Sequence, residues 1–173
     1  MISNELRRKG YKTEVISFPD YSTAIGKIIR KFLEGEISFT PDVRQFLYVA
    51  NRLERLPDIK RWLNDDKIVI ADRYTPSGLV YGYVNGLDLN WMINLEKDIP
   101  KATITIVIDV PAKTAYNRVE EKDLYESDLE FQTRVRSTYL ELARKFEWTV
   151  IKGERSLEEI AEEVLKEIYD YLK

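Results

Sequence analysis

An acidic and a basic residue, Asp72 and Arg73, directly follow KIVIA, an apolar run typical of a buried strand. A carboxylate and a guanidinium are costly to remove from water unless they are paired or bound to a ligand. Asp72 can orient water on a bound magnesium ion, and Arg73 can hold a phosphate with two parallel hydrogen bonds. Ser77 and Gly78 then allow a ligand to approach the backbone closely. An Asp–Arg ion pair at the start of a helix explains the same residues equally well.

Two other segments carry side chains suited to a nucleotide. FPDYSTAIGKII, residues 18–29, has the pattern strand, turn, helix, and ligands of parallel α/β sheets bind where strands end. In FLYVANRLERLPDIK, Tyr48 and Arg52 lie four residues apart on one helix face, where they could stack on a base and donate to its carbonyl. Each segment also has a structural explanation: a plain loop with Ser22 or Thr23 as helix cap, and a core tyrosine beside a solvated arginine.

Composition limits the possible chemistry. The 173 residues, 44% hydrophobic and 33% charged, suit one globular domain, and the net charge of −3 argues against a nucleic-acid binder. The sequence contains no cysteine and no histidine, which excludes disulfides, thiolate sites and histidine-based catalysis. Carboxylates, Arg, Lys, Tyr and an oxygen-ligated cation such as Mg²⁺ remain. No apolar run reaches the length of a membrane span and no signal peptide is visible, so we expect a cytoplasmic protein without membrane contact.

Strand and helix patterns alternate along the chain. Runs rich in β-branched residues predict four strands, at 12–18, 67–73, 103–110 and 148–153. Helical spacing of apolar residues predicts helices at 22–34, 42–64, 77–84, 89–98, 111–121, 126–146 and 156–172. This alternation predicts an α/β fold with a parallel sheet covered by helices on both faces.

Local signals refine several of these helices. Ser156 and Glu159 form a capping box, and Pro57 is expected to kink or break the helix over 42–64. The opening MISNELRRKG has the pattern of the second half of a helix that ends at Gly10, a residue favoured beyond a helix C-terminus.

FPDYSTAIGK, LYVANR and DRYTPSG, in this order at the ends of successive elements, resemble the thymidylate kinase family. TITIVIDVPAKTAYNRV is similar to the strand and helix that lead to the family's lid, at about 118–130, and DLYESDLEFQTRVRSTYLELA to the lid and its long helix. The resemblance implies a P-loop kinase-type fold forming one domain over 1–173. It also implies phosphoryl transfer from ATP to dTMP with Mg²⁺, in dTTP biosynthesis, and a homodimer.

The resemblance also assigns roles to individual residues. It implies that Asp72 and Arg73 are catalytic, with Asp72 near the magnesium ion, and that Arg118 and Lys122 lie on the ATP side. The residues implied to bind dTMP are Phe18, Pro19, Tyr21, Tyr48, Arg52, Arg73, Ser77, Gly78, Tyr81 and Tyr125.

The chain departs from the family pattern at two positions. Tyr21 stands where many members have an arginine that contacts the acceptor phosphate. Leu124 stands where many members have a lid arginine, and Lys122 is the nearest basic substitute. Which basic residue serves the lid is therefore open.

The largest departure is that GxxxxGK(S/T) occurs nowhere in the sequence. The family's first, central strand and its P-loop are missing with it, so strands 67–72 and 103–110 are expected to have unpaired edges. Either Met1 is an internal methionine of a longer chain, which we favour, or the chain is degenerate. In both cases we expect negligible kinase activity and poor stability of these 173 residues.

Other functions remain open. The chain could be a non-catalytic deoxynucleotide-binding module that retains the dTMP pocket. It could also be a related pyrimidine monophosphate kinase, because Tyr48 and Arg52 suit a pyrimidine carbonyl edge without recognising the thymine methyl group. A purely structural or interaction domain is a third alternative.

Overall fold

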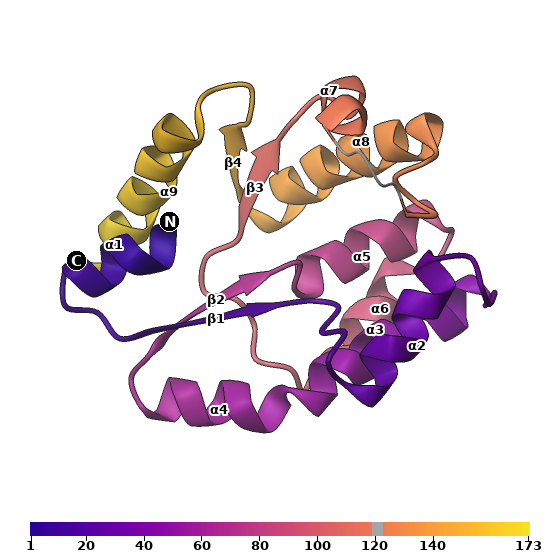
Figure 1. Ribbon diagram of the computed structural model, residues 1–173, viewed down its shortest axis with the longest axis horizontal. Helices are drawn as coiled ribbons and strands as arrows, with labels where there is room; N and C mark the ends of the chain where they lie inside the picture. Colours follow the sequence, from indigo (N-terminus) through magenta and orange to yellow (C-terminus); the bar gives the residue numbers. More distant parts are fainter. Residues whose placement is uncertain (119–122) are drawn as a thin grey trace.

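The computed structural model describes residues 1–118 and 123–173 and has an α/β architecture with parallel strands (Figure 1). Its strands are β1 (Thr13–Ser17), β2 (Ile68–Asp72), β3 (Ile106–Asp109) and β4 (Thr149–Lys152). β1 pairs with β2, placing Ser17 opposite Asp72, and β3 pairs with β4, placing Asp109 opposite Lys152. All four predicted strands are confirmed, although β3 begins at Ile106 and not at residue 103, because its partner β4 begins only at Thr149.

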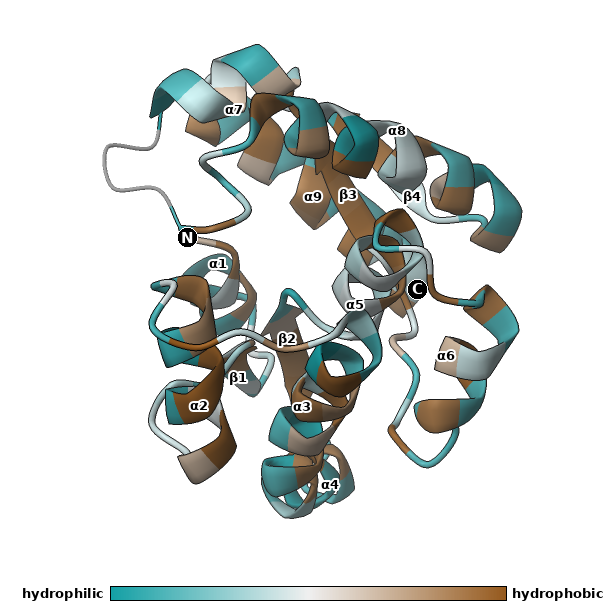
Figure 2. Cartoon of the chain, turned by 90° about the vertical axis from the view of Figure 1, so that its right-hand side faces the viewer, coloured by the Kyte–Doolittle hydropathy of each residue, from teal (hydrophilic) through white to brown (hydrophobic). Residues whose placement is uncertain are grey.

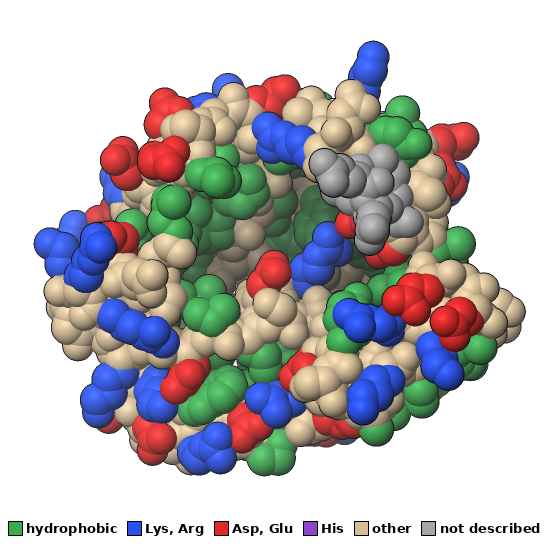
Figure 3. Space-filling model, in the orientation of Figure 1, with side chains coloured by type: hydrophobic (Ala, Val, Ile, Leu, Met, Phe, Trp, Pro, Cys, Tyr) green, Lys and Arg blue, Asp and Glu red, His purple; other side chains and the backbone are tan. Residues whose placement is uncertain are grey.

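The strands form two separate two-stranded sheets instead of one continuous sheet. Within the described ranges, β2 pairs with β1 alone and β3 pairs with β4 alone. The expectation of unpaired edges on these two strands is therefore confirmed. Figure 3 shows a hollow lined by hydrophobic side chains, at the place where Figure 1 has β1 and β2 on one side and β3 and β4 on the other.

Helices cover the strands and fill the space beside them. They are α1 (Ile2–Arg8), α2 (Ala24–Leu33), α3 (Pro41–Glu54), α4 (Leu56–Asn64), α5 (Thr75–Val84), α6 (Leu89–Leu95), α7 (Ala112–Arg118), α8 (Leu129–Phe146) and α9 (Leu157–Leu172). α4 packs on β2, α1 on β1, and α8 on both β3 and β4, while α5 contacts α3, α6 and α8. Across the described ranges, every helix is too short or too polar to cross a membrane.

Two hydrophobic clusters hold these elements together. One gathers side chains of α2, α5, α6 and α8, among them Val80 and Met92, which are completely buried. The other lies against β1 and β2 and includes Phe18, Val49 and Tyr74. Figure 2 shows β3 as a hydrophobic strand, whereas hydrophobic and hydrophilic residues are mixed along the helices.

Local sequence signals set most element boundaries. The helix predicted over 42–64 breaks at Arg55, two residues before Pro57, and becomes α3 and α4. The Ser156–Glu159 capping box is present, and Gly10 has φ +92°, which suits the residue after the α1 cap.

Three predicted helix starts are shifted by two or three residues, among them that of α2, which begins at Ala24 and not at residue 22. α5 begins at Thr75 and not at residue 77, because a proline is tolerated in the first turn. α8 begins at Leu129 and not at residue 126, because the Asp128 carboxylate caps it by accepting a hydrogen bond from the Phe131 N–H.

Candidate functional site

The candidate site lies where β1 and β2 end side by side. Ser17 is opposite Asp72, and the Phe18 N–H donates to the Asp72 carbonyl at 2.9 Å, so the two strands leave the sheet in register. The loop after β1 and the start of α5 after β2 therefore begin at the same edge, which is the edge where parallel sheets bind ligands.

Asn51 of α3 fixes the loop after β1, a role that sequence reasoning missed although the residue lies in the LYVANR motif. Its Oδ1 accepts from the Asp20 N–H at 2.8 Å, and its Nδ2 donates to Thr23 Oγ1 at 2.8 Å. Thr23 in turn caps α2 by accepting from the Gly26 N–H at 3.0 Å. Asn51 is almost completely buried, so these bonds hold the loop without competition from water.

Aromatic rings form one wall of the site. The rings of Tyr81 and Tyr125 are 5.3 Å apart, and Tyr125 stacks on Phe131 at 5.0 Å. Tyr48 packs against the same hydrophobic cluster. Burial raises the pKa of its hydroxyl, and nearby Tyr125, Tyr21 and Tyr81 raise it further. The structure thus brings together the aromatic residues that were predicted from three separate segments.

Arg73 lies beside this cluster. It has φ +55°, its side chain is half exposed, and its Nη2 is 4.0 Å from Glu126 Oε1. Burial lowers the pKa of the Arg73 guanidinium, but Tyr81, Tyr139 and Asp72 raise it by more. The pKa is therefore raised overall, and the group stays protonated. Tyr81 interacts with both Arg73 and Tyr48. Tyr48 and Tyr81 line one small cavity, so Tyr81 lies between the Tyr48 ring and the surroundings of Arg73.

Asp72, the residue suited to a cation, is exposed at the end of β2. In the part of the chain that the structure describes, no three His, Cys, Asp or Glu side chains are grouped to hold a metal ion. Mg²⁺ commonly binds through one or two carboxylates together with substrate phosphates and water. A single exposed Asp72 fits that manner of binding.

Arg52 is buried below the site. Only 3% of it is exposed, and it forms an ion pair with the buried carboxylate of Glu96, which precedes β3 by ten residues. A Cβ on Gly78 would lie 2.9 Å from Arg52 Nη2, so the glycine allows α5 to pass close to the guanidinium. The sequence pattern indicated a solvated or base-facing arginine and contained no signal for Glu96.

Ser77 is tied to α8 by a hydrogen bond of 2.7 Å between its Oγ and the Tyr139 hydroxyl. Burial raises the pKa of Tyr139 to about 12, and the side chain also lies near Arg73 and Asp72. Tyr139 is a site residue that sequence reasoning missed, because it lies 62 positions from Ser77 in the chain.

The remaining predicted residues take different positions. Phe18 is buried, with its ring 5.6 Å from that of Tyr74, and therefore supports the site from within the core. The Tyr21 ring lies under the Arg30 guanidinium at 4.6 Å. Arg118 is exposed at the end of α7, and Lys122 lies outside the described residues.

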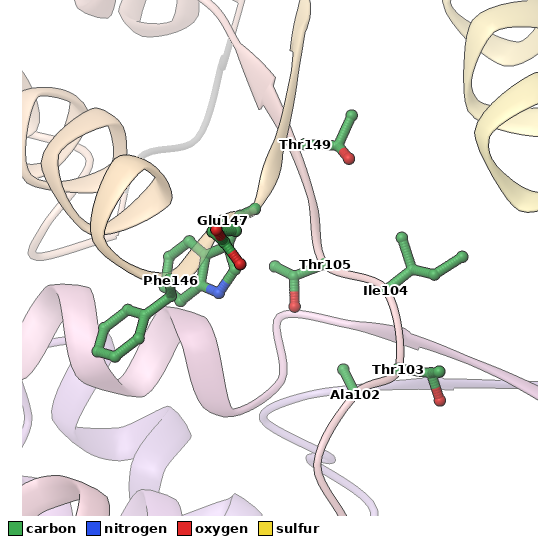
Figure 4. Close-up of a pocket in the computed structure, with 8 residues that line it drawn as sticks. Ala102, Thr103, Ile104, Thr105, Phe146, Glu147 and Thr149 are labelled. Atoms are coloured by element: carbon green, nitrogen blue, oxygen red, sulfur yellow. The ribbon is translucent and has the colours of Figure 1, made fainter. Parts of the chain in front are cut away.

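Two cavities border the described elements. One of about 10 Å³ lies within the aromatic wall and is lined by Tyr48, Tyr81 and Tyr125 among others. The larger, of about 190 Å³, lies between the segment before β3 and the turn between α8 and β4 (Figure 4). Threonines 103, 105 and 149 line this larger cavity, at the amino ends of the strands and thus at the opposite end from Asp109. The residues predicted to border a base line the smaller cavity, which has room for about one water molecule.

The chain is similar to thymidylate kinases in comparisons of both sequence and structure. A family model described as thymidylate kinase matches residues 1–164. The thymidylate kinase of Dictyostelium discoideum is 30% identical over 152 residues, 88% of this chain and 68% of that protein. A probable thymidylate kinase of Methanocaldococcus jannaschii is 34% identical over 152 residues, 88% of this chain and 78% of that protein. The solved structure of thymidylate kinase from Candida albicans matches with a TM-score of 0.84 at 23% identity, covering 98% of this chain and 83% of that one, and shows the fold.

Proposed function

Because this chain belongs to the thymidylate kinase family, we propose that it binds dTMP at the ends of β1 and β2, as the acceptor of a phosphoryl group from ATP. The observation that carries the proposal is that Arg73 lies beside Tyr81, one of the rings of the aromatic wall. A positive charge and a group of aromatic rings, both beside Tyr81, suit a ligand with a phosphate at one end and an aromatic base at the other.

The residues of the site have complementary tasks in this proposal. Arg73 holds the acceptor phosphate with paired N–H donors, and Tyr48 and Tyr81 border the base and sugar. Phosphoryl transfer depends on positioning and positive charge more than on an acid–base pair, so a site without histidine suits it.

Mg²⁺ fits beside Asp72, which would supply a carboxylate ligand. When bound, the ion neutralises charge on the phosphates. The sequence contains no GxxxxGK(S/T), so we assign no residues of these 173 to the phosphates of the donor ATP. Our expectation of negligible transfer by these 173 residues stays a prediction.

Calorimetric titration of the purified chain tests the proposal. We expect dTMP to bind and to raise the melting temperature, and thymidine to bind more weakly because it lacks the phosphate. Failure of dTMP to bind would contradict the proposed function. A coupled assay for dTDP, with the mass of the product verified, then tests the transfer step separately.

A second candidate function is a deoxynucleotide-binding module without transfer activity. The division of the strands into two sheets favours it, because β2 and β3 share no paired strand within the described ranges. Stabilisation by dTMP without formation of dTDP would support this alternative. Equal stabilisation by dTMP and by dUMP would favour a broader pyrimidine monophosphate kinase instead.

We also propose that two copies of the chain associate through α3. Phe46 is 50% exposed and its ring lies 5.5 Å from that of Trp91 in α6, while Val43 and Leu53 on α3 are exposed as well. An apolar surface of this kind suits a partner. The mass of the chain in solution, measured by light scattering, checks the proposal.

A further inference from the structure

The buried ion pair of Arg52 and Glu96 is the most unusual polar feature below the site. The two side chains are 3% and 6% exposed, and they join α3 to the segment after α6 across 44 positions of the chain. Charged groups are rarely buried this deeply, because removing each ion from water costs roughly several kcal/mol. The pair therefore calls for an explanation beyond packing.

The pair does not satisfy its own hydrogen bonds. Within the described residues, Arg52 Nε has no acceptor and Glu96 Oε2 has no donor, although both atoms are buried. The hydroxyl of Tyr74 lies near both Arg52 and Glu96 and likewise has no hydrogen-bond partner among residues 1–118 and 123–173. A purely structural pair gains most when all its donors and acceptors are used. The unused donor and acceptor atoms leave this group able to bind a further polar partner.

The position of the pair indicates what that contact is. Arg52 follows Tyr48 by one helical turn, so its side chain lies on the same face of α3 as the ring proposed to border the base. On the other side, the absence of a side chain at Gly78 lets α5 approach both groups: an added Cβ would lie 2.9 Å from Arg52 Nη2 and 3.1 Å from Glu96 Oε1. The pair thus lies under the edge of the proposed base position.

A guanidinium can only donate hydrogen bonds. It therefore complements a ring carbonyl and opposes a ring amino group. We propose that Glu96 is a positioning residue for base recognition, which orients the Arg52 guanidinium toward the 4-carbonyl oxygen of a thymine or uracil ring and against the 4-amino group of a cytosine ring. This inference rests on the proposed function, because it requires a pyrimidine nucleotide beside Tyr48.

Glu96 suits this task better than a neutral partner would. Its carboxylate compensates the buried charge of Arg52 and fixes the plane of the guanidinium, which limits the directions in which the remaining N–H groups can donate. Burial raises the pKa of Glu96, and the Arg52 guanidinium opposes that effect by favouring the charged carboxylate. Removal of the carboxylate would leave the guanidinium free to reorient.

Binding of two matched nucleotides to the wild-type chain and its variants tests this proposal. Calorimetry with dTMP and with 5-methyl-dCMP, which differ at positions 3 and 4 of the ring, gives a ratio of dissociation constants. We expect the wild-type chain to prefer dTMP and Glu96→Gln to reduce that preference by about tenfold or more, the effect of one misplaced buried hydrogen bond. Glu96→Asp keeps the charge but shortens the side chain, and should reduce the preference while the chain stays folded.

Glu14→Gln is the matched control. Glu14 forms an ion pair with Lys67 at 2.7 Å near the amino ends of β1 and β2, away from the site, so its loss should leave the ratio unchanged. If Glu96→Asp and Glu96→Gln lower the melting temperature but keep the wild-type ratio, the pair is structural and the inference is wrong. If the wild-type chain binds neither nucleotide, the proposed function and this inference both fail.

Discussion

Arg73 combines a left-handed backbone conformation with a half-exposed guanidinium, so the residue is held in place while its charge stays accessible. A non-glycine residue with positive φ costs some free energy, and such residues gather at ligand sites. The neighbouring Tyr81, Tyr139 and Asp72 favour the charged form of the guanidinium and raise its pKa. These features are what a phosphate-binding arginine requires.

Replacement of this arginine by lysine should therefore weaken dTMP binding selectively. Arg73→Lys keeps the positive charge but loses the pair of parallel N–H donors, so we expect a loss of about tenfold in dTMP affinity. Thymidine, which has no phosphate, should bind the variant and the wild-type chain equally well in the same calorimetric titration. Arg8→Lys, in an exposed ion pair with Glu5 of α1, is the control and should change neither affinity.

Asp109, at the end of β3, provides a prediction for the pH dependence of stability. It accepts two hydrogen bonds from Arg136, at 2.6 and 2.9 Å, and this contact lowers its pKa in the folded chain. Because the folded-state pKa lies below the unfolded value of about 3.9, the stabilisation is present above that pH. It is lost as the pH falls through the folded-state pKa.

Urea unfolding of Asp109→Asn between pH 7 and pH 3 checks this linkage. The variant should be less stable than the wild-type chain at pH 7, and its free energy of unfolding should fall less steeply with decreasing pH. Asp65→Asn, at an exposed residue after α4, should follow the wild-type curve. An unchanged slope for Asp109→Asn would contradict the assignment.

At the scale of elements, the first turn of α2 is packed directly against the loop after β1. A Cβ on Gly26 would lie 1.8 Å from the carbonyl oxygen of Asp20, a contact that neither backbone can tolerate without moving. This glycine lies in the first turn of α2, on the helix that carries the Thr23 cap. The position of the loop therefore depends on the absence of a side chain at residue 26.

Gly26→Ala should destabilise the chain by about 1–3 kcal/mol, the usual effect of overpacking a filled site. Thermal and urea unfolding measure the loss, and dTMP affinity should decline with it because the loop carries Tyr21. Lys27→Ala, at the exposed neighbouring position, should change the free energy of unfolding by less than about 0.5 kcal/mol. Equal effects of the two substitutions would show that the close contact is relieved at little cost.

The elements themselves were largely predictable, and their contacts were not. Pro57, Ser156 and Gly10 act on their immediate neighbours, so the break after α3, the start of α9 and the end of α1 could be predicted from sequence. Glu96 and Tyr139 reach the site through contacts that span 44 and 62 positions, and a local pattern contains no information about such pairs. Asn51 stood in a recognised motif, but its bonds to the loop depend on how α3 packs.

At the scale of the whole molecule, the two sheets divide the chain into parts joined mainly by helices. A two-stranded sheet is marginal by itself, so β1 and β2 depend on α1 and α4, and β3 and β4 on α8 and α9. α5 and α8 link the two parts, and both contribute residues to the site through Ser77 and Tyr139. Nucleotide binding at that junction should therefore stabilise the molecule as a whole, which the melting experiment with dTMP measures.

The open edges of β2 and β3 have a consequence for the exchange of amide hydrogens with deuterated solvent. In a parallel pair, alternate N–H groups point toward and away from the partner strand. The Ile68 N–H donates to Lys12 and the Thr149 N–H to the Thr105 carbonyl, so the amides of Val69, Ala71, Ile106 and Ile108 point away from β1 and β4. Nuclear magnetic resonance should record fast exchange at these four positions and slow exchange at Ile70 and Val107, an alternation that a strand bound between the two sheets would abolish.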